Sequence, residues 1–263
     1  MKLKISCFNK GVLVNDIKRF GWIGICYLIF LLFEIPFKIF MMNASNTTHP
    51  AYSSQTMKDI FNNDILLTST AVIPVLTAIL LFRYIQNKKS VDMIHALPIK
   101  RGKLYDNHIF IGILILIVPV IITALSALLL KEALNLNTAT IHFTIKNVTS
   151  WASLTILFDI VIFLSSVLVG MFTGLSTAQG ILTYIFLFLP IGLTTLISYN
   201  LKFFLYGVAS DYYLSNKIEF FSPITRFSNN TPMTSIEIFI YIISCIVFYL
   251  VARFAYHKRN LEA

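Results

Sequence analysis

Six long apolar runs constrain this chain more than any other feature of its sequence. They occupy residues 20–40, 65–84, 109–130, 151–172, 179–198 and 236–254. Because a helix rises about 1.5 Å per residue, a run of about 20 residues crosses the roughly 30 Å hydrocarbon core of a bilayer. Hydrophobic residues make up 57% of the 263 residues and charged residues only 13%, which argues against an ordinary soluble domain. The sequence therefore predicts an all-α membrane protein with six transmembrane helices.

The net charge of +9 gathers in the polar segments beside these runs. With the N-terminus in the cytoplasm, fourteen of the 21 Lys and Arg residues fall on the cytoplasmic side and seven fall outside. The positive-inside rule then predicts a multi-pass plasma-membrane protein with both termini cytoplasmic. We expect a single domain, 1–263, with an interfacial N-terminal part at 1–19, a membrane domain at 20–254 and a cytoplasmic tail at 255–263. Anionic lipid headgroups, and not nucleic acid, are the expected partner of these charges.

The residues just before the first run have an amphipathic pattern. Apolar side chains recur at helical spacing on one face, and polar side chains occupy the other. The apolar positions are Leu13, Val14, Ile17 and Phe20, and the polar positions are Asn15, Asp16, Lys18 and Arg19. The pattern predicts a helix lying in the inner membrane interface and ending near Trp22. A plain cytoplasmic extension of the first span is the alternative.

Three segments are predicted to lie outside the cell, at 42–64, 131–150 and 199–235. The last of them combines many aromatic residues with few charges. Such a composition suits an interfacial or partly re-entrant cap at the outer surface. An ordinary loop that touches lipid is equally compatible with it.

The stretch "NKKSVDMIHALPIKRGKLYDNH" at 87–108 is the most polar and most patterned piece of the chain interior. Ser90 suits a helix N-cap, and Pro98 disfavours helical geometry in the residue before it. Between them, the apolar positions at helical spacing are Val91, Ile94 and Leu97. This predicts a short cytoplasmic helix parallel to the membrane, between the second and third spans. The apolar face of this helix must be buried against either a protein groove or lipid headgroups, and the pattern fits both.

Ionisable residues inside the predicted spans are candidates for a transport pathway, because an unpaired charge in hydrocarbon costs about 3 kcal/mol or more. Glu34 and Lys38 lie four residues apart in the first span, so an ion pair between them is the favoured interpretation. Asp159 lies in the fourth span with no cation one turn away. It either faces a polar pathway or accepts hydrogen bonds from hydroxyl groups on another helix.

Motifs for chemistry within this chain are missing. The sequence contains no "GxxxxGK[ST]" for ATP phosphates, no "HExxH" for zinc and no "GxSxG" for a nucleophilic serine. The five histidines and three cysteines are too dispersed to indicate a metal site or a disulfide framework. We therefore predict no catalytic residue, no metal ligand and no cofactor in this chain, which is not expected to be an enzyme.

Four short stretches carry a resemblance to a known family. They are "FNKG" at 8–11, "FRYIQNKK" at 82–89, "HALPIKR" at 95–101 and "YHKRNLEA" at 256–263. Together with six spans, they resemble the permease subunits of bacterial type-2 ABC transporters, especially the Ytr group and the staphylococcal exporters of phenol-soluble modulins. The likeness covers most of the chain, and its specificity lies mainly around "HALPIKR".

The resemblance implies a permease that exports an amphipathic peptide or another lipophilic substrate. A separate ATPase subunit, present in two copies, would bind ATP and Mg, and a second permease subunit, identical or related, would complete a dimer. The segment between the second and third spans would be a coupling helix that docks on the ATPase. The docking positions implied are Val91, Met93, Ile94, His95, Ala96, Leu97, Pro98 and Arg101. A membrane interaction protein that senses or sequesters peptides and confers immunity without transport is the alternative.

Overall fold

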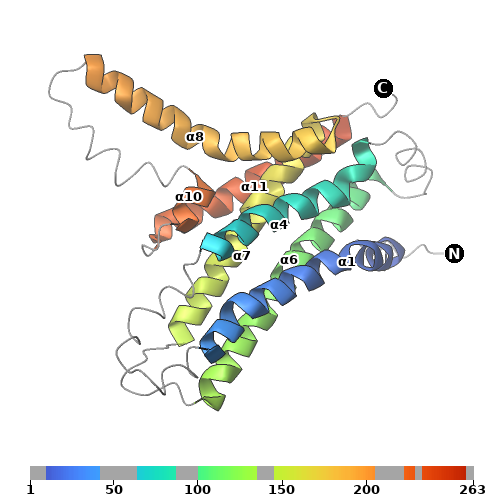
Figure 1. The fold of residues 1–263 in the computed structure, drawn as a ribbon. Coiled ribbons are helices and arrows are strands. Elements are labelled where there is room, and N and C mark those ends of the chain that lie inside the picture. The colour runs from blue at the N-terminus through green and yellow to red at the C-terminus, as the bar shows by residue number, and fades with distance from the viewer. Residues whose placement is uncertain are drawn as a thin grey trace.

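The computed structural model describes residues 10–41, 64–86, 100–134, 145–204, 222–228 and 233–258. In these ranges every regular element is a helix, and six helices are long and apolar enough to cross a membrane (Figure 1). They are α1 (Lys10–Leu32), α4 (Asp64–Phe82), α6 (Arg101–Ala133), α7 (Ile145–Phe172), α8 (Ser176–Phe204) and α11 (Ser235–Lys258). The predicted all-α class with six candidate spans is confirmed.

Three short helical elements extend or join these six. The π-helix η1 (Phe33–Phe37) continues α1 around Pro36, and the 3-10 helix η3 (Arg83–Gln86) continues α4. Proline lacks a backbone N–H and cannot complete the regular hydrogen-bond ladder, which accounts for the widened turn of η1. The short helix α10 (Pro223–Ser228) precedes α11.

Helix α7 forms the centre of the bundle and packs against α4, α6, α8 and α11 (Figure 1). Helix α1 lies beside α6 at one edge. Small residues permit this close packing: a Cβ atom on Gly112 of α6 would lie 2.2 Å from Cζ of Phe163 on α7. Because lipid tails are as apolar as leucine, such tight van der Waals packing contributes more to helix association in a membrane than burial of apolar surface does.

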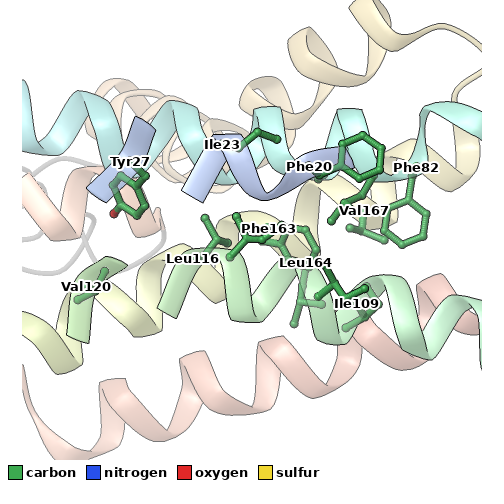
Figure 2. Close-up of a cluster of buried hydrophobic side chains, with 14 of the residues drawn as sticks. Phe20, Ile23, Tyr27, Phe82, Ile109, Leu116, Val120, Phe163, Leu164 and Val167 are labelled. Atoms are coloured by element: carbon green, nitrogen blue, oxygen red, sulfur yellow. The ribbon is translucent and has the colours of Figure 1, made fainter. Parts of the chain in front are cut away.

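The main hydrophobic core lies between α1, α4, α6 and α7 (Figure 2). Aromatic side chains Phe20, Phe82 and Phe163 contribute from three of these helices. Smaller aliphatic residues fill the space between the rings; examples are Ile23, Ile109, Leu116, Val120, Leu164 and Val167. The core brings the first half of α1 into the same packed unit as α4 and α7.

The helices are longer than the apolar runs that predict them. Helix α1 begins at Lys10 and α6 at Arg101, and an acidic side chain in the second turn of each, Asp16 and Asp106, finds a partner inside the bundle. Helical structure also extends into the segments 131–150 and 199–235, since α6 reaches Ala133, α7 begins at Ile145 and α8 reaches Phe204; the placement of these segments outside the cell stays a prediction. Helical structure satisfies the backbone of these flanking residues internally, which is favoured beside a membrane.

The amphipathic residues at the chain start belong to α1 itself, which is one uninterrupted helix. Its first turns are seen nearly end-on in Figure 1, whereas the rest runs along α6, so the helix bends. Phe20 is buried, Leu13 is half-buried, and Val14 and Ile17 are exposed. The placement of these turns in a membrane interface stays a prediction.

Helix α8 bends near its middle and leaves the bundle (Figure 1). Pro190 lies in the middle of α8, and proline is a common cause of such a bend. No residue of α8 after Leu187 is buried. The second half of α8 is therefore mostly exposed to its surroundings.

Candidate functional site

We call the end of the bundle where α1 and α6 begin and α4 and α11 end the proximal end (Figure 1). The opposite end is the distal end. The segment 87–99, which contains the predicted coupling helix, joins α4 to α6 at the proximal end and lies outside the described residues. The residues that flank it in the chain are described, and many of them are polar.

The proximal cluster is a set of buried polar and aromatic side chains from four helical elements. Its members are Asp16 of α1, Tyr84 of η3, Tyr105, Asn107 and His108 of α6, and Tyr256 of α11. Each is at most 7% exposed. Buried polar side chains in proteins are normally paired, so the contacts of this cluster determine how the four elements fit together.

His108 and Asp16 lie at the centre of the proximal cluster. The distance from His108 Nδ1 to Asp16 Oδ2 is 2.6 Å, and the two side chains are only 5% and 6% exposed. Among the described residues, neither atom has a partner in hydrogen-bond geometry. The contact therefore has the distance of an ion pair without the direction of a hydrogen bond, and its attraction depends on charge.

Aromatic rings surround this pair. The ring of Tyr84 lies 5.1 Å from that of His108, and Phe82 meets His108 edge-on at 5.8 Å. The hydroxyl groups of Tyr84 and Tyr256 are 3.2 Å apart, which links η3 to α11. Tyr105 of α6 packs on Tyr256 with 5.6 Å between ring centroids. The pair is thereby enclosed and shielded from water.

An ion pair between Arg253 and Asp106 holds α6 against α11 at the proximal end. The Arg253 guanidinium donates to Asp106 Oδ2 at 3.0 Å, and the Tyr249 hydroxyl donates to Asp106 Oδ1 at 2.7 Å. Nearby, a Cβ atom on Gly102 would lie 3.1 Å from Nε2 of His257, so the first turn of α6 rests closely on the end of α11. The start of α6 is thus fixed to α11.

A chain of amide groups fixes the end of α4 to the start of α8. Gln86 is the last residue of η3, and its Nε2 donates to Oε1 of Gln179 at 2.8 Å. The Ser176 hydroxyl donates to Oε1 of Gln86. Gln179 in turn donates to the backbone oxygen of Ser166 at 3.0 Å. A Cβ on Gly170 would lie 2.6 Å from the Gln179 amide nitrogen, so only glycine leaves room for this link.

At the distal end, α10 packs against α4, α7 and α8. Its Arg226, 7% exposed, donates from an NH2 nitrogen to Glu237 Oε2 of α11 at 3.0 Å and from Nε at 3.3 Å. The backbone N–H of Thr234 donates to the same carboxylate oxygen at 3.2 Å. Part of the aromatic segment 199–235 therefore folds onto the helix bundle, as a cap would. Its position relative to a membrane surface is still a prediction.

The structure bears differently on each residue that the sequence analysis predicted to be functional. Seven of the docking positions, Val91 to Pro98 except Asp92, lie outside the described residues, and Arg101 is the exposed first residue of α6. Glu34 pairs with Lys38, as the spacing predicts. Asp159 accepts a hydrogen bond from the Tyr27 hydroxyl of α1 at 3.0 Å, which agrees with the second interpretation offered for it. A role in a transport pathway stays a prediction for both Glu34 and Asp159.

Sequence reasoning missed the proximal cluster and the distal ion pair. Asp16, Asp106 and His108 stand in polar stretches beside apolar runs, where charged residues usually face water or headgroups. One signal was present: Tyr249, Arg253 and Tyr256 recur at helical spacing on one face of the last span. A face with two tyrosines and an arginine inside an apolar helix indicates polar partners on a neighbouring helix.

The residues on the outer surface of the bundle indicate whether lipid or water surrounds it. Leu193 and Ile197 of α8 are 50% and 54% exposed, and Ile246 and Leu250 of α11 are each 54% exposed. Polar residues such as Asp159 and His108 are instead buried. Continuous apolar faces of this size are stable in lipid and not in water. The chain is a multi-pass helical membrane protein.

Comparison with known proteins adds no family to this conclusion, since neither a scan against protein-family models nor a search of curated proteins finds a match. In the described part of this membrane protein, no three His, Cys, Asp or Glu side chains come together as metal ligands. The candidate site is therefore the set of polar contacts among the described residues that border the segment 87–99.

Proposed function

We propose that this membrane protein is the permease subunit of an ATP-driven exporter and that the segment 87–99 docks on a separate ATPase subunit. Two features support the proposal. The stretch around "HALPIKR" resembles the coupling region of type-2 ABC permeases, and the flanks of that stretch are tied to the rest of the bundle by polar contacts.

The contacts on both sides of the segment 87–99 carry the proposal. On one side, Gln86 binds Gln179 and Ser176, so η3 moves with the start of α8. On the other side, Asp106 binds Arg253 and Tyr249, so the start of α6 moves with α11. A partner that pushes on the segment would therefore displace four helices together, which is what coupling of ATP hydrolysis to transport requires.

In this arrangement the ATPase contacts the apolar and basic side chains between α4 and α6. The contact residues are Val91, Met93, Ile94, His95, Ala96, Leu97, Pro98 and Arg101. ATP and Mg bind to the ATPase, in two copies, and a second permease subunit, identical or related, completes the assembly. The proximal end and both termini then face the cytoplasm, in agreement with the positive-inside rule.

The cargo is an amphipathic peptide or another lipophilic substrate that leaves the cell. The exposed apolar faces of α8 and α11 support this class, because they offer a route along the lipid boundary for a molecule with an apolar side. Asp159 and Glu34 are the candidate polar positions of the pathway, since both are buried acidic residues in the spans.

Docking is tested by substitution of Ile94 or Leu97 with Glu, followed by purification of the tagged chain from native membranes. We expect the Walker-motif ATPase, identified by mass spectrometry, to co-purify with the unaltered protein and to be lost from Ile94→Glu and Leu97→Glu. Ile94→Val is the matched control and should retain it. Undiminished co-purification by the Glu variants would refute docking. Absence of any such ATPase from the unaltered preparation would favour the interaction protein.

A further inference from the structure

The geometry points to a proton-binding pair: we infer that His108 and Asp16 form a latch that holds the first turns of α1 on α6 only while the histidine is protonated. The ligand of this site is a proton. The inference rests on contacts at the proximal end and does not depend on the proposed transport activity.

The contact between the two side chains supports an electrostatic latch. Nδ1 of His108 and Oδ2 of Asp16 are 2.6 Å apart and both side chains are almost completely buried. Because hydrogen-bond geometry is absent from this contact among the described residues, a neutral imidazole would gain little from it. An imidazolium opposite a carboxylate gains much more, since charges attract strongly where water is excluded.

The described groups around His108 and Asp16 are neutral, paired with other residues or exposed. The attraction between the two side chains therefore depends on the proton on His108. From η3, the titratable side chain that faces the ring is Tyr84, whose hydroxyl meets that of Tyr256 from α11. Within α6, Tyr105 donates to the backbone oxygen of Tyr249. The other charged residues described nearby have partners or point outward. Asp106 binds Arg253, Asp159 of α7 accepts from Tyr27, and Lys18 and Arg19 of α1 are exposed.

Loss of the proton would weaken the hold on α1. The Asp16 carboxylate would then be buried opposite a neutral ring, and burial of a charge without a compensating partner is strongly unfavourable. The first turns of α1 can relieve this by swinging outward until Asp16 reaches water. Asn107 is fully buried, and neither of its side-chain amide atoms has a hydrogen-bond partner among the described residues. Its amide is therefore available to rearrange when α1 moves.

An outward movement of Asp16 can be confined to the first turns of α1. Gly21 follows Asp16 on α1, and a Cβ there would have as its nearest neighbour only Ile17 of the same helix, at 3.8 Å. Gly24 is instead packed on α6, where a Cβ would lie 3.3 Å from the backbone oxygen of Ile115. The part of α1 from Gly24 onward is thus fixed to α6. The turns before Gly21 are held by the pair, by Phe20 and by the half-buried Val12 and Leu13, which pack against the core.

The test measures the distance between α1 and α6 as the pH changes. Spin labels are placed at Asn15→Cys and Leu114→Cys, two exposed positions, in a protein whose native cysteines are replaced by serine and which is reconstituted in lipid nanodiscs. Distances are recorded from about pH 5 to about pH 9, the range that brackets the usual titration of histidine. We expect one short distance in acid and a second, longer population that grows in alkali and disappears on return to acid.

Three variants make the test specific. His108→Gln should abolish the pH dependence, whereas His257→Gln, at an exposed position on α11, should leave it unchanged. The exchange of both residues, Asp16→His with His108→Asp, should restore the pH dependence because the pair is re-formed in the opposite sense. If the single variants fail to fold, the imidazole nitrogens of His108 are followed by NMR in the protein without substitution at His108. Their signal must then change over the same pH range as the distance between α1 and α6.

Some results would overturn the latch. A distance that stays constant from acid to alkali in the unaltered protein would do so, and so would a pH dependence that survives His108→Gln. Loss of the dependence in His257→Gln would assign the titration to the other histidine. An NMR titration of His108 that is out of step with the distance change would show that its proton does not control α1.

Discussion

Tyr27 of α1 donates a hydrogen bond to Asp159 of α7 across 3.0 Å, in the interior of the bundle. Both residues are fully buried. The other carboxylate oxygen of Asp159, Oδ1, has no hydrogen-bond partner among the described residues. The polar group of Asp159 therefore depends on a single donor from another helix, which makes this contact a sensitive point of the fold.

Substitution of Tyr27 by Phe should destabilise the protein. It removes the only described donor to Asp159 while the ring volume is kept, and an unsatisfied buried acceptor costs about 1–3 kcal/mol. We expect a lower midpoint of thermal unfolding for the purified protein in detergent. Tyr199→Phe, at a position that is 53% exposed, is the matched control and should leave the midpoint unchanged. An unaltered midpoint in Tyr27→Phe would mean that the hydrogen bond contributes nothing.

Substitution of Asp159 by Asn separates a structural role from a role in transport. The amide oxygen can still accept from the Tyr27 hydroxyl, so assembly and the unfolding midpoint should change little. If Asp159 lies on the pathway of the proposed exporter, efflux of substrate from cells should fall. Unchanged efflux would leave Asp159 with its structural role alone.

Substitution of Gly112 by Ala should strain the contact between α6 and α7. The new Cβ would lie 2.2 Å from Phe163 Cζ and 2.9 Å from Leu81 Cδ1, and both neighbours are buried. Overpacking of a core typically costs about 1–3 kcal/mol. A lower resistance to chemical unfolding in mixed micelles should follow, and Phe163→Leu in the same chain should recover part of it.

The control for this strain is Gly192→Ala on the exposed half of α8, where a Cβ would meet nothing within 4 Å. Because alanine favours a helix by roughly 1 kcal/mol over glycine, this variant should be neutral or slightly more stable. Equal losses for Gly112→Ala and Gly192→Ala would show that the contact with Phe163 is not the cause of the effect.

Much of the fold could be predicted from sequence because length and apolar content decide whether a helix can span a bilayer. The pair of Glu34 and Lys38 was also predictable, since residues four apart share a helix face and a buried carboxylate needs a cation. Hydrogen bonding from another helix was one of two interpretations for Asp159, and the structure supplies Tyr27 as the donor. In each case the local sequence contains most of the physical argument.

The proximal cluster could not be predicted in the same way because its contacts join distant parts of the chain. Asp16 meets His108 and Asp106 meets Arg253, so each pair combines two helices whose relative placement no local pattern gives. In sequence, these residues resemble charged flanks of spans, which generally face headgroups. Arg226 is a similar case: it stands in a segment predicted to be outside, yet it is buried against Glu237.

Substitution of Lys38 by Met should destabilise α1 near Pro36. The variant removes the partner of the Glu34 carboxylate, whose side chain is 7% exposed, and Lys38 itself is 35% exposed. Because Lys38 is partly solvated, we expect a loss of about 1–3 kcal/mol, below the cost of breaking a fully buried pair. The double variant Glu34→Leu with Lys38→Met should regain most of it, measured by unfolding in mixed micelles. A double variant as unstable as Lys38→Met would show that the pair itself is not the cause.

Substitution of Glu237 by Gln should release α10 from α11. Arg226 would lose the carboxylate that accepts from its Nε and one NH2 nitrogen, and a charge-assisted hydrogen bond of this kind contributes about 1.5–3 kcal/mol. A protease that cleaves after arginine, such as trypsin, should then cut after Arg226 much faster than in the unaltered protein, and mass spectrometry of the fragments identifies the site. Glu132→Gln, an exposed acidic residue at the same end of the bundle, is the matched control and should not accelerate this cut. Equal rates in Glu237→Gln and the unaltered protein would show that packing of α10 on α4, α7 and α8 holds it in place without the ion pair.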